Sequence, residues 1–305
     1  DDYNGGSFQV INFGGTGLSG GTGGNCSTLN HIVKVIDTYN LYINVVGLAD
    51  TNSVSFSNTT NMVVDTLDAN TNNNLYAISS LNNLSAYDVS LTNQPTTPNQ
   101  ECSFLNAPSG SINGNDVQIN VECITNQYSI AVDVSGLVKG NSVNLLNNGK
   151  DFLQIDLNGI TLFNLLQDDE TEYDITVQAQ PSDPDQQCDI INGNGFISGS
   201  NLTIDVVCNV VNYPLAINVS GLAQSNFVDV LNNGMDFLRI TSNGLSFFNQ
   251  SFPDFSDYAI AFLLQPSSPN QTCTFDISNM GMINGPENIV LLTCVTNSYF
   301  IGGFV

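Results

Sequence analysis

The sequence repeats itself every 85 residues, and this period constrains the fold more than any other feature. Several short segments recur in a second and a third copy, in the same order and at the same shift. They are Gly136-Leu137 and Gly221-Leu222, Leu146-Asn147-Asn148-Gly149 and Leu231-Asn232-Asn233-Gly234, Asp151-Phe152-Leu153 and Asp236-Phe237-Leu238, and Gln180-Pro181 and Gln265-Pro266. A first, more divergent copy keeps Gly47-Leu48 and Gln94-Pro95. Because a fixed period indicates one structural unit built several times, we expect three homologous domains, at residues 39–124, 125–209 and 210–295.

Each copy has the pattern of short β-strands. In the second copy, apolar side chains occupy every second position of residues 128–135, which predicts a half-buried strand. The next apolar runs are separated by Asn148-Gly149 and Asn158-Gly159, and Asn-Gly readily adopts the positive φ values of tight hairpins. Further strands are predicted at residues 173–180, 187–191 and 202–207. About seven short strands per copy predict an all-β fold, a tandem array of three immunoglobulin-like β-sandwiches.

Six of the seven cysteines form evenly spaced pairs. The pairs are Cys102 and Cys123, Cys188 and Cys208, and Cys273 and Cys294, separated by 21, 20 and 21 positions. A zinc site needs clustered ligands, but the sequence has no Cys-x-x-Cys and a single histidine, His31, which we expect to be structural. We therefore predict three local disulfides, which indicate an oxidising compartment outside the cytoplasm. Cys26 has no partner in this scheme and is either a free thiol or a link to another chain.

Charge excludes one class of partner. The chain has 4 Lys and Arg against 28 Asp and Glu, a net charge of −24, so it has almost no cations to pair with phosphate. We expect no binding to nucleic acid.

No apolar run reaches the roughly 18 residues that span a bilayer, so we expect no membrane insertion. A basic and apolar leader is also missing at the start, and we expect Asp1 to be the terminus left after signal-peptide removal.

No catalytic or cofactor-binding motif is recognisable, and we predict neither enzymatic activity nor a cofactor. Acidic runs at residues 167–174 and 183–189 have the oxygen ligands that Ca²⁺ prefers. Their counterparts in the third copy, residues 253–258 and 267–272, lose most of the carboxylates. We therefore interpret the acidic runs as solvated loops. Asn-x-Ser/Thr sequons are frequent, but in a chain so rich in Asn they leave glycosylation open.

The order of the repeated elements resembles a known type of repeat. Gly-Leu, Leu-Asn-Asn-Gly, Asn-Gly, Gln-Pro, Cys and Cys follow one another as in the disulfide-containing immunoglobulin-like repeat of large bacterial exported and cell-surface proteins. The resemblance covers residues 39–294. It implies an extracellular structural or adhesive role without enzymatic chemistry.

Both ends of the sequence resemble parts of a repeat. Residues 8–19 resemble residues 188–198, and residues 31–36 precede Tyr39 much as the strand bearing Cys208 precedes Tyr213. Residues 1–38 thus look like the last strands of a sandwich. Residues 294–305 resemble the start of one, so residues 296–305 look like a first strand. We expect incomplete sandwich pieces at both termini.

These pieces suggest a structural subunit of an extracellular bacterial filament, a pilus-like fibre that polymerises head to tail by β-strand exchange between copies. The predicted donor strand is apolar on both faces and comprises Tyr299, Phe300, Ile301, Gly302, Gly303, Phe304 and Val305. The predicted acceptor residues are Phe8, Val10, Ile11, Ile32, Val33, Val35 and Ile36. Three alternatives stay open: a sequence boundary inside a domain, an edge strand folded back on its own domain, and a monomeric surface adhesin or stalk segment that binds a host receptor or glycan.

Overall fold

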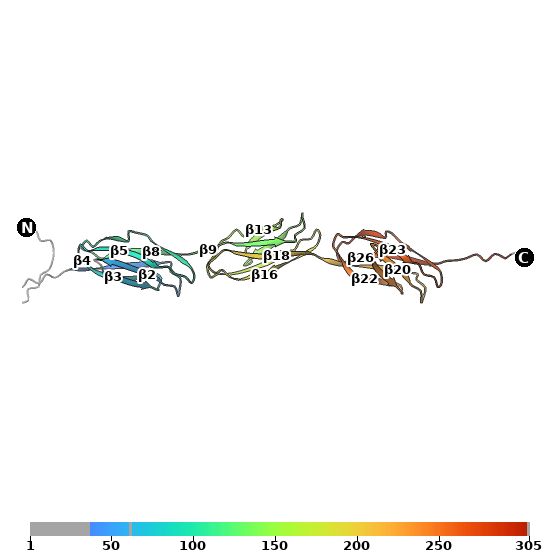
Figure 1. The fold of residues 1–305 in the computed structure, drawn as a ribbon, viewed down its shortest axis with the longest axis horizontal. Helices are drawn as coiled ribbons and strands as arrows, with labels where there is room; N and C mark the ends of the chain where they lie inside the picture. Colours follow the sequence, from blue (N-terminus) through green and yellow to red (C-terminus); the bar gives the residue numbers. More distant parts are fainter. Residues whose placement is uncertain (1–36, 61–62, 304–305) are drawn as a thin grey trace, which may run out of the picture. The chain divides into compact units, whose positions relative to one another are not determined.

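The computed structural model describes residues 37–60 and 63–303. Within these residues the chain has 26 strands and no helix, and the strands build β-sandwiches one after another along the sequence (Figure 1). The predicted fold class, all-β with immunoglobulin-like sandwiches in tandem, is confirmed. Most of the predicted N-terminal piece, residues 1–36, lies outside the described residues.

The first sandwich consists of two four-stranded sheets. Its strands are β1 (Thr38–Val46), β2 (Val54–Thr60), β3 (Val63–Ala69), β4 (Asn74–Asn82), β5 (Ala86–Asn93), β6 (Gln100–Phe104), β7 (Ser109–Ser111) and β8 (Val117–Thr125). One sheet has the order β4-β1-β8-β6 and the other the order β3-β2-β5-β7. Leu41 and Ile119 from the first sheet and Phe56 from the second are fully buried in the core between them.

The second and third sandwiches repeat this topology. The second contains β9 (Gln127–Tyr128), β10 (Ile130–Ser135), β11 (Val143–Asn147), β12 (Asp151–Ile155), β13 (Gly159–Leu162), β14 (Gln167–Asp168), β15 (Glu172–Ala179), β16 (Gln186–Ile191), β17 (Asn194–Phe196) and β18 (Leu202–Val210). The third contains β19 (Asn212–Ser220), β20 (Val228–Asn232), β21 (Asp236–Ile240), β22 (Gly244–Pro253), β23 (Asp257–Leu264), β24 (Gln271–Phe275), β25 (Met280–Met282) and β26 (Asn288–Thr296). Their sheets are β13-β10-β18-β16 with β12-β11-β15-β17, and β22-β19-β26-β24 with β21-β20-β23-β25.

The first long strand of every sandwich is a central strand. β1 pairs antiparallel with β4 and parallel with β8, and β10 and β19 have the same two kinds of neighbour. In β1 every second side chain, Leu41, Ile43 and Val45, is fully buried. A strand bonded on both edges contributes two ladders of backbone hydrogen bonds to its sheet.

The Gly-Leu element of each repeat marks a turn that requires glycine. Gly136 has φ of +75°, and a Cβ atom there would lie 2.2 Å from the carbonyl oxygen of Cys208. Gly47 and Gly221 stand in the same relation to Cys123 and Cys294. A larger residue would push the turn away from the last strand of the sandwich.

One of the two expected Asn-Gly hairpins forms and the other does not. Asn148-Gly149 joins β11 and β12 as a hairpin, with φ of +51° and +66°. Asn158-Gly159 instead leads from β12 to β13, which lie in opposite sheets. The physical reason is that the Asn158 side chain bonds the backbone of Leu137, accepting from its N–H at 2.9 Å and donating to its carbonyl at 2.8 Å.

The described chain divides into two compact units, and the division does not follow the repeats. One unit holds the residues up to Tyr128 together with Asp168–Thr171 and Ile197–Ser200. The other holds the rest of the second sandwich and the third sandwich. Two short segments of the second repeat therefore belong with the first sandwich, and their contacts are described below.

Candidate assembly interface

Each sandwich carries one disulfide between directly opposed residues of its last antiparallel strand pair. The bonds are Cys102–Cys123 between β6 and β8, Cys188–Cys208 between β16 and β18, and Cys273–Cys294 between β24 and β26. The Cα atoms of each pair are 3.9 Å apart. The spacing of the cysteines in the sequence matches these three bonds.

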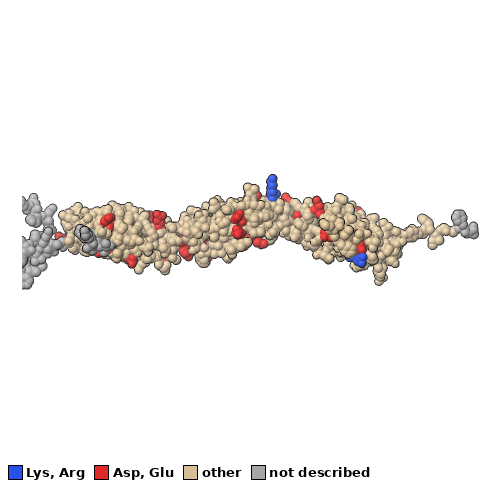
Figure 2. Space-filling view, in the orientation of Figure 1, with Lys and Arg blue, Asp and Glu red and all other residues tan. Residues whose placement is uncertain are grey.

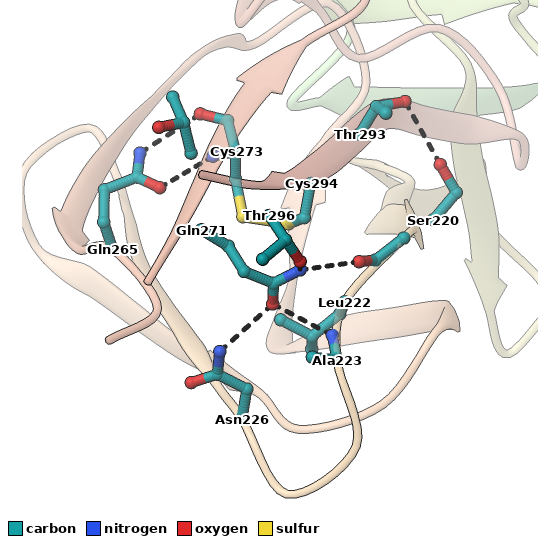
Figure 3. The surroundings of a disulfide bond; sticks show 12 residues. Ser220, Leu222, Ala223, Asn226, Gln265, Gln271, Cys273, Thr293, Cys294 and Thr296 are labelled. Carbon is teal, nitrogen blue, oxygen red and sulfur yellow. Dashed lines mark hydrogen bonds between the residues drawn. A yellow bond between two sulfur atoms is a disulfide. The ribbon is translucent and has the colours of Figure 1, made fainter. Parts of the chain in front are cut away.

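A glutamine brackets the first cysteine of each bond. Gln265 accepts a hydrogen bond from the Cys273 N–H at 2.9 Å and donates one to the Cys273 carbonyl at 3.1 Å (Figure 3). Gln180 does the same at Cys188, and Gln94 at Cys102. This reciprocal pair explains why the Gln-Pro element always stands eight residues before a cysteine.

A second, buried glutamine ties the disulfide region to the loop at the same end of the sandwich. Gln271 donates to the Gly221 carbonyl at 2.8 Å and accepts from the Ala223 N–H at 2.9 Å and the Asn226 amide at 3.1 Å (Figure 3). Asn226 in turn donates to the Pro269 carbonyl at 2.8 Å. Residues 267–270, and their counterparts 96–99 and 182–185, are called the end loops below. Asn52 and Asn141 hold the other two end loops through the same bond.

Two of the end loops contact a buried aspartate of the following repeat. Within the first compact unit, the Asn99 N–H donates to Asp169 Oδ2 at 2.6 Å, and the Asp169 N–H donates to the Asn126 carbonyl at 2.9 Å. The other carboxylate oxygen, Oδ1, accepts from the Gly199 N–H at 2.7 Å. Asp169 is 3% exposed.

The second contact repeats the first inside the other compact unit. The Asp185 N–H donates to Asp254 Oδ2 at 2.8 Å, the Asp254 N–H donates to the Val211 carbonyl at 2.9 Å, and the Gly285 N–H donates to Asp254 Oδ1 at 3.0 Å. Asp169 and Asp254, called the tip aspartates below, thus join successive repeats by bonds to backbone. Hydrogen bonds to a carboxylate are shorter and stronger than those between neutral groups.

The tip aspartates correct one expectation and supply residues that sequence reasoning missed. The run at residues 167–174 was expected to be a solvated loop, and Asp168, Glu170 and Asp174 are indeed exposed. Asp169 is buried because the end loop of the first sandwich covers it. The available signal was that an aspartate recurs 85 positions later, at 254, where most other carboxylates of the run are lost.

A tyrosine lies beside the second end loop. The Tyr213 hydroxyl donates to Asp185 Oδ2 at 2.5 Å. This hydrogen bond, together with partial burial and the negative charges of Asp185 and Asp254, raises the pKa of Tyr213 to about 12. At the third end loop, the Asn270 side-chain amide donates to the Tyr299 hydroxyl at 3.3 Å. Residues 297–299 therefore take a position on their end loop that is similar to that of residues 211–213.

Beyond β26 the predicted donor segment is exposed. Residues 297–303 lie outside any strand, and Phe300 and Ile301 are fully exposed. Phe304 and Val305 lie outside the described residues. The same is true of Cys26, of His31, and of all the predicted acceptor residues, Phe8, Val10, Ile11, Ile32, Val33, Val35 and Ile36.

In the rest of the described chain, metal binding or catalysis would need a cluster of metal ligands or a pocket with paired acidic and basic side chains. Among residues 37–60 and 63–303, no three His, Cys, Asp or Glu side chains come together as metal ligands. A hollow of about 520 Å³ in the third sandwich is lined by Asp257, Tyr258 and Met280 among others. Its side chains form no pair of acid and base. These described ranges also contain no helix that could cross a membrane.

Acidic side chains are scattered over the surface. On the face shown in Figure 2 they stand singly among uncharged residues, and basic side chains are rare. Arg239, one of the few cations, pairs with the buried Asp229 at 2.8 Å. Most of the polar surface is therefore uncharged, as the composition indicates.

Comparison with known proteins gives fold neighbours only. No family model matches the chain, and no curated protein sequence matches it. The Bacillus anthracis TIE protein is similar in structure, with 13% identity and a TM-score of 0.46 over 86% of this chain and 51% of that chain. The major pilin subunit of Bacillus cereus is also similar, with 10% identity and a TM-score of 0.30 over 86% of this chain and 100% of that chain. A streptococcal ancillary pilin has 10% identity and a TM-score of 0.27 over 84% of this chain and 99% of that chain. The chain thus spans about half the length of the TIE protein. At these values the similarity says nothing about what this chain binds.

Proposed function

We propose that the chain is a structural subunit of an extracellular bacterial filament that assembles head to tail by β-strand exchange. In this proposal the repeats at residues 39–124, 125–209 and 210–295 form the body, and residues 1–38 and 296–305 are the exchanged pieces. The observation that carries the proposal is the exposed apolar segment after β26, in which Phe300 and Ile301 bury nothing. Such a segment is a hazard for aggregation unless a partner covers it.

The central place of the first strand sharpens the proposal. The donor segment resembles the first strand of a repeat. The equivalent strand β10 lies between β13 and β18, so a donor in its position would gain a ladder on each edge. The predicted acceptor residues 31–36 resemble β18, the parallel neighbour of β10. Donor and acceptor would then be adjacent strands of one sheet, with backbone hydrogen bonds as the source of affinity.

An extracellular location is supported by the three disulfides, because such bonds persist in oxidising compartments. The net charge of −24 argues against nucleic acid as a partner. The partners in this proposal are other copies of the chain. A host or surface ligand is compatible with it, since exposed loops between the strands offer binding positions.

Removal of the donor segment tests the proposal. Deleting Tyr299–Val305 should leave folded monomers, whereas the full chain should form filaments, and sedimentation velocity and electron microscopy measure both. Two point variants form a matched pair. Ile301 aligns with the fully buried Ile130, so Ile301→Asp should abolish polymers. Phe300 aligns with Ser129, so Phe300→Ser should weaken polymers less than Ile301→Asp does. Polymers that persist after the deletion would refute strand exchange.

A stalk or adhesin segment is the second candidate, and the tip aspartates favour it. The buried carboxylates of Asp169 and Asp254 each bond the end loop of the preceding repeat, a contact that suits a spacer made of tandem domains. Electron microscopy of the purified full chain separates the two candidates. Uniform filaments support the subunit, and single particles at all concentrations support the stalk.

A further inference from the structure

The end of the third sandwich carries the same backbone groups that bind the tip aspartates elsewhere. In the first two sandwiches these groups are an end-loop N–H, from Asn99 or Asp185, and the carbonyl of Asn126 or Val211. The corresponding groups of the third sandwich are the Asn270 N–H and the Asn297 carbonyl. In each sandwich one hydrogen bond holds the two residues of the pair together. The N–H groups of Asn126, Val211 and Asn297 donate to the carbonyls of Asn99, Asp185 and Asn270 at 2.9, 2.9 and 3.0 Å.

The third end has the shape of the other two but is exposed. Asn99 and Asp185 are half-buried under a tip aspartate, whereas Asn270 and Asn297 are exposed. Within residues 37–60 and 63–303 the Asn270 N–H donates to no side chain, and Asn270 keeps the same turn bridge, to Ser267, that Asn99 forms with Thr96 and Asp185 with Ser182. The loop is nevertheless held in place by Asn226 and Gln271, as in the other repeats. The end therefore needs no rearrangement to accept a carboxylate, which lowers the entropic cost of binding.

We propose that this end, formed by the Asn270 N–H and the Asn297 carbonyl, is a docking surface for the tip of a further sandwich that carries an aspartate in the position of Asp169 and Asp254. The aspartate side chain would accept from Asn270 and its own N–H would donate to Asn297. Tyr299 is consistent with a sandwich as the occupant. It bonds Asn270 of the third end loop as Tyr213, at the start of the third sandwich, bonds Asp185 of the second end loop.

The first sandwich of another copy does not meet this requirement. The residue in the tip position there is Asn83, which is exposed. Its Oδ1 accepts from the Gly114 N–H at 2.9 Å, as the tip aspartates accept from Gly199 and Gly285. The other polar atom of the Asn83 side chain, Nδ2, is a hydrogen-bond donor. It would lie opposite the N–H of Asn270, also a donor, so no hydrogen bond could form between them. The surface thus selects aspartate over asparagine. The inference goes beyond the proposed function and does not depend on strand exchange.

An extended chain tests the docking surface. Residues 1–298 are joined to a second copy of residues 213–305, which places an added sandwich with its own tip aspartate after the third end. Amide hydrogen exchange is followed at Asn270, with the Asn99 and Asp185 amides as internal references. We expect the Asn270 amide to exchange fast in the natural chain and about 10-fold more slowly or better in the extended chain, as for a bond worth about 1.4 kcal/mol.

The matched control replaces only the added tip aspartate, by Asp254→Asn in the second copy. Core amides of the added sandwich report that it has folded in both versions. We expect the control to return Asn270 to the fast exchange of the natural chain. Fast exchange at Asn270 beside a folded added sandwich with its aspartate overturns the proposal. The proposal is also overturned if the Asn270 amide exchanges equally slowly in the extended chain with aspartate and in the asparagine control. Slow exchange of the Asn270 amide in the natural chain overturns it as well.

Discussion

At the scale of single residues, uncharged amides and a few carboxylates hold the loops in this chain. Gln271 is 3% exposed and bonds three backbone or side-chain groups of its own loop region. A buried amide can donate and accept at once without the desolvation cost of a charge. This chemistry lets a chain with only 10% charged residues fix the ends of its sandwiches.

The tyrosine beside the second end loop predicts a late titration. The pKa of Tyr213 is raised to about 12, while an ordinary tyrosine ionises near 10. A raised pKa favours the neutral phenol in the folded protein, so the contribution of the Asp185 bond is complete below pH 10 and is lost as pH rises through 12. An ultraviolet titration of tyrosine absorbance should show one late step near pH 12.

Two variants assign that step. Tyr213→Phe should remove it, because no phenol then faces Asp185. Tyr299→Phe serves as the control and should leave it in place, since Tyr299 bonds an amide instead of a carboxylate. A late step that survives in Tyr213→Phe would contradict the assignment.

At the scale of elements, each disulfide joins two neighbouring strands of one sheet, β6 and β8 in the first sandwich. The first strand of each sandwich is held by noncovalent contacts alone. Cys188–Cys208 closes a loop with a separation of 20 residues. Such a cross-link stabilises by roughly 3 kcal/mol on the chain-entropy model. The double variant Cys188→Ala, Cys208→Ala should therefore destabilise the second sandwich by about 3 kcal/mol, measured by hydrogen exchange of its core amides in denaturant.

The neighbouring sandwiches provide the control for this prediction. Their own disulfides stay intact in the double variant, so their core amides should change by less than about 0.5 kcal/mol. An unchanged second sandwich would show that the bond is dispensable there. Equal losses in all three sandwiches would instead indicate that they unfold as one unit.

Much of the fold could be predicted from the sequence because the strands alternate clearly. Residues 128–135 were predicted as one strand and form β9 and β10, and the predicted strand at residues 202–207 is part of β18. The turn at Asn158-Gly159 was misjudged because its role is set by a side-chain bond to Leu137, 21 positions away, which local propensity does not encode. β17 was missed for a similar reason: it has only three residues, Asn194–Phe196, and they pair with β15 earlier in the sequence.

The candidate interface was only partly predictable. The exposed apolar segment at residues 299–303 could be recognised, since its composition differs from that of the other first strands. The tip aspartates were hard to single out, because Asp169 stands among other acids of the same run and only its recurrence at position 254 sets it apart. Its burial depends on an end loop 70 positions earlier in the sequence.

At the scale of the whole molecule, charge sets the conditions for association. Copies with a net charge of −24 repel one another, and the chain offers only 4 cations to oppose this. Strand exchange through backbone bonds and apolar side chains is insensitive to salt, whereas the repulsion is screened by it. Polymerisation should therefore increase as NaCl is raised from about 10 mM to 150 mM, across which the Debye length falls from about 30 to 8 Å.

Sedimentation velocity over this range of salt measures the effect. The deletion lacking Tyr299–Val305 has nearly the same charge and should stay monomeric throughout, which separates screening from salting out. Polymers that dissolve as salt is raised would show that attraction between charges drives association, contrary to the proposal.

The parallel pairing of the first and last strands has a mechanical consequence. The chain enters a sandwich at the start of β1 and leaves it at the end of β8, so tension along the chain slides the two strands past each other. The hydrogen bonds along Leu41–Val46 and Val117–Glu122 are then loaded together and not one after another. If β1 does pull free, the Cys102–Cys123 bond keeps the residues between the cysteines from extending. Each sandwich is thus built to resist force first by its ladder and then by a covalent stop.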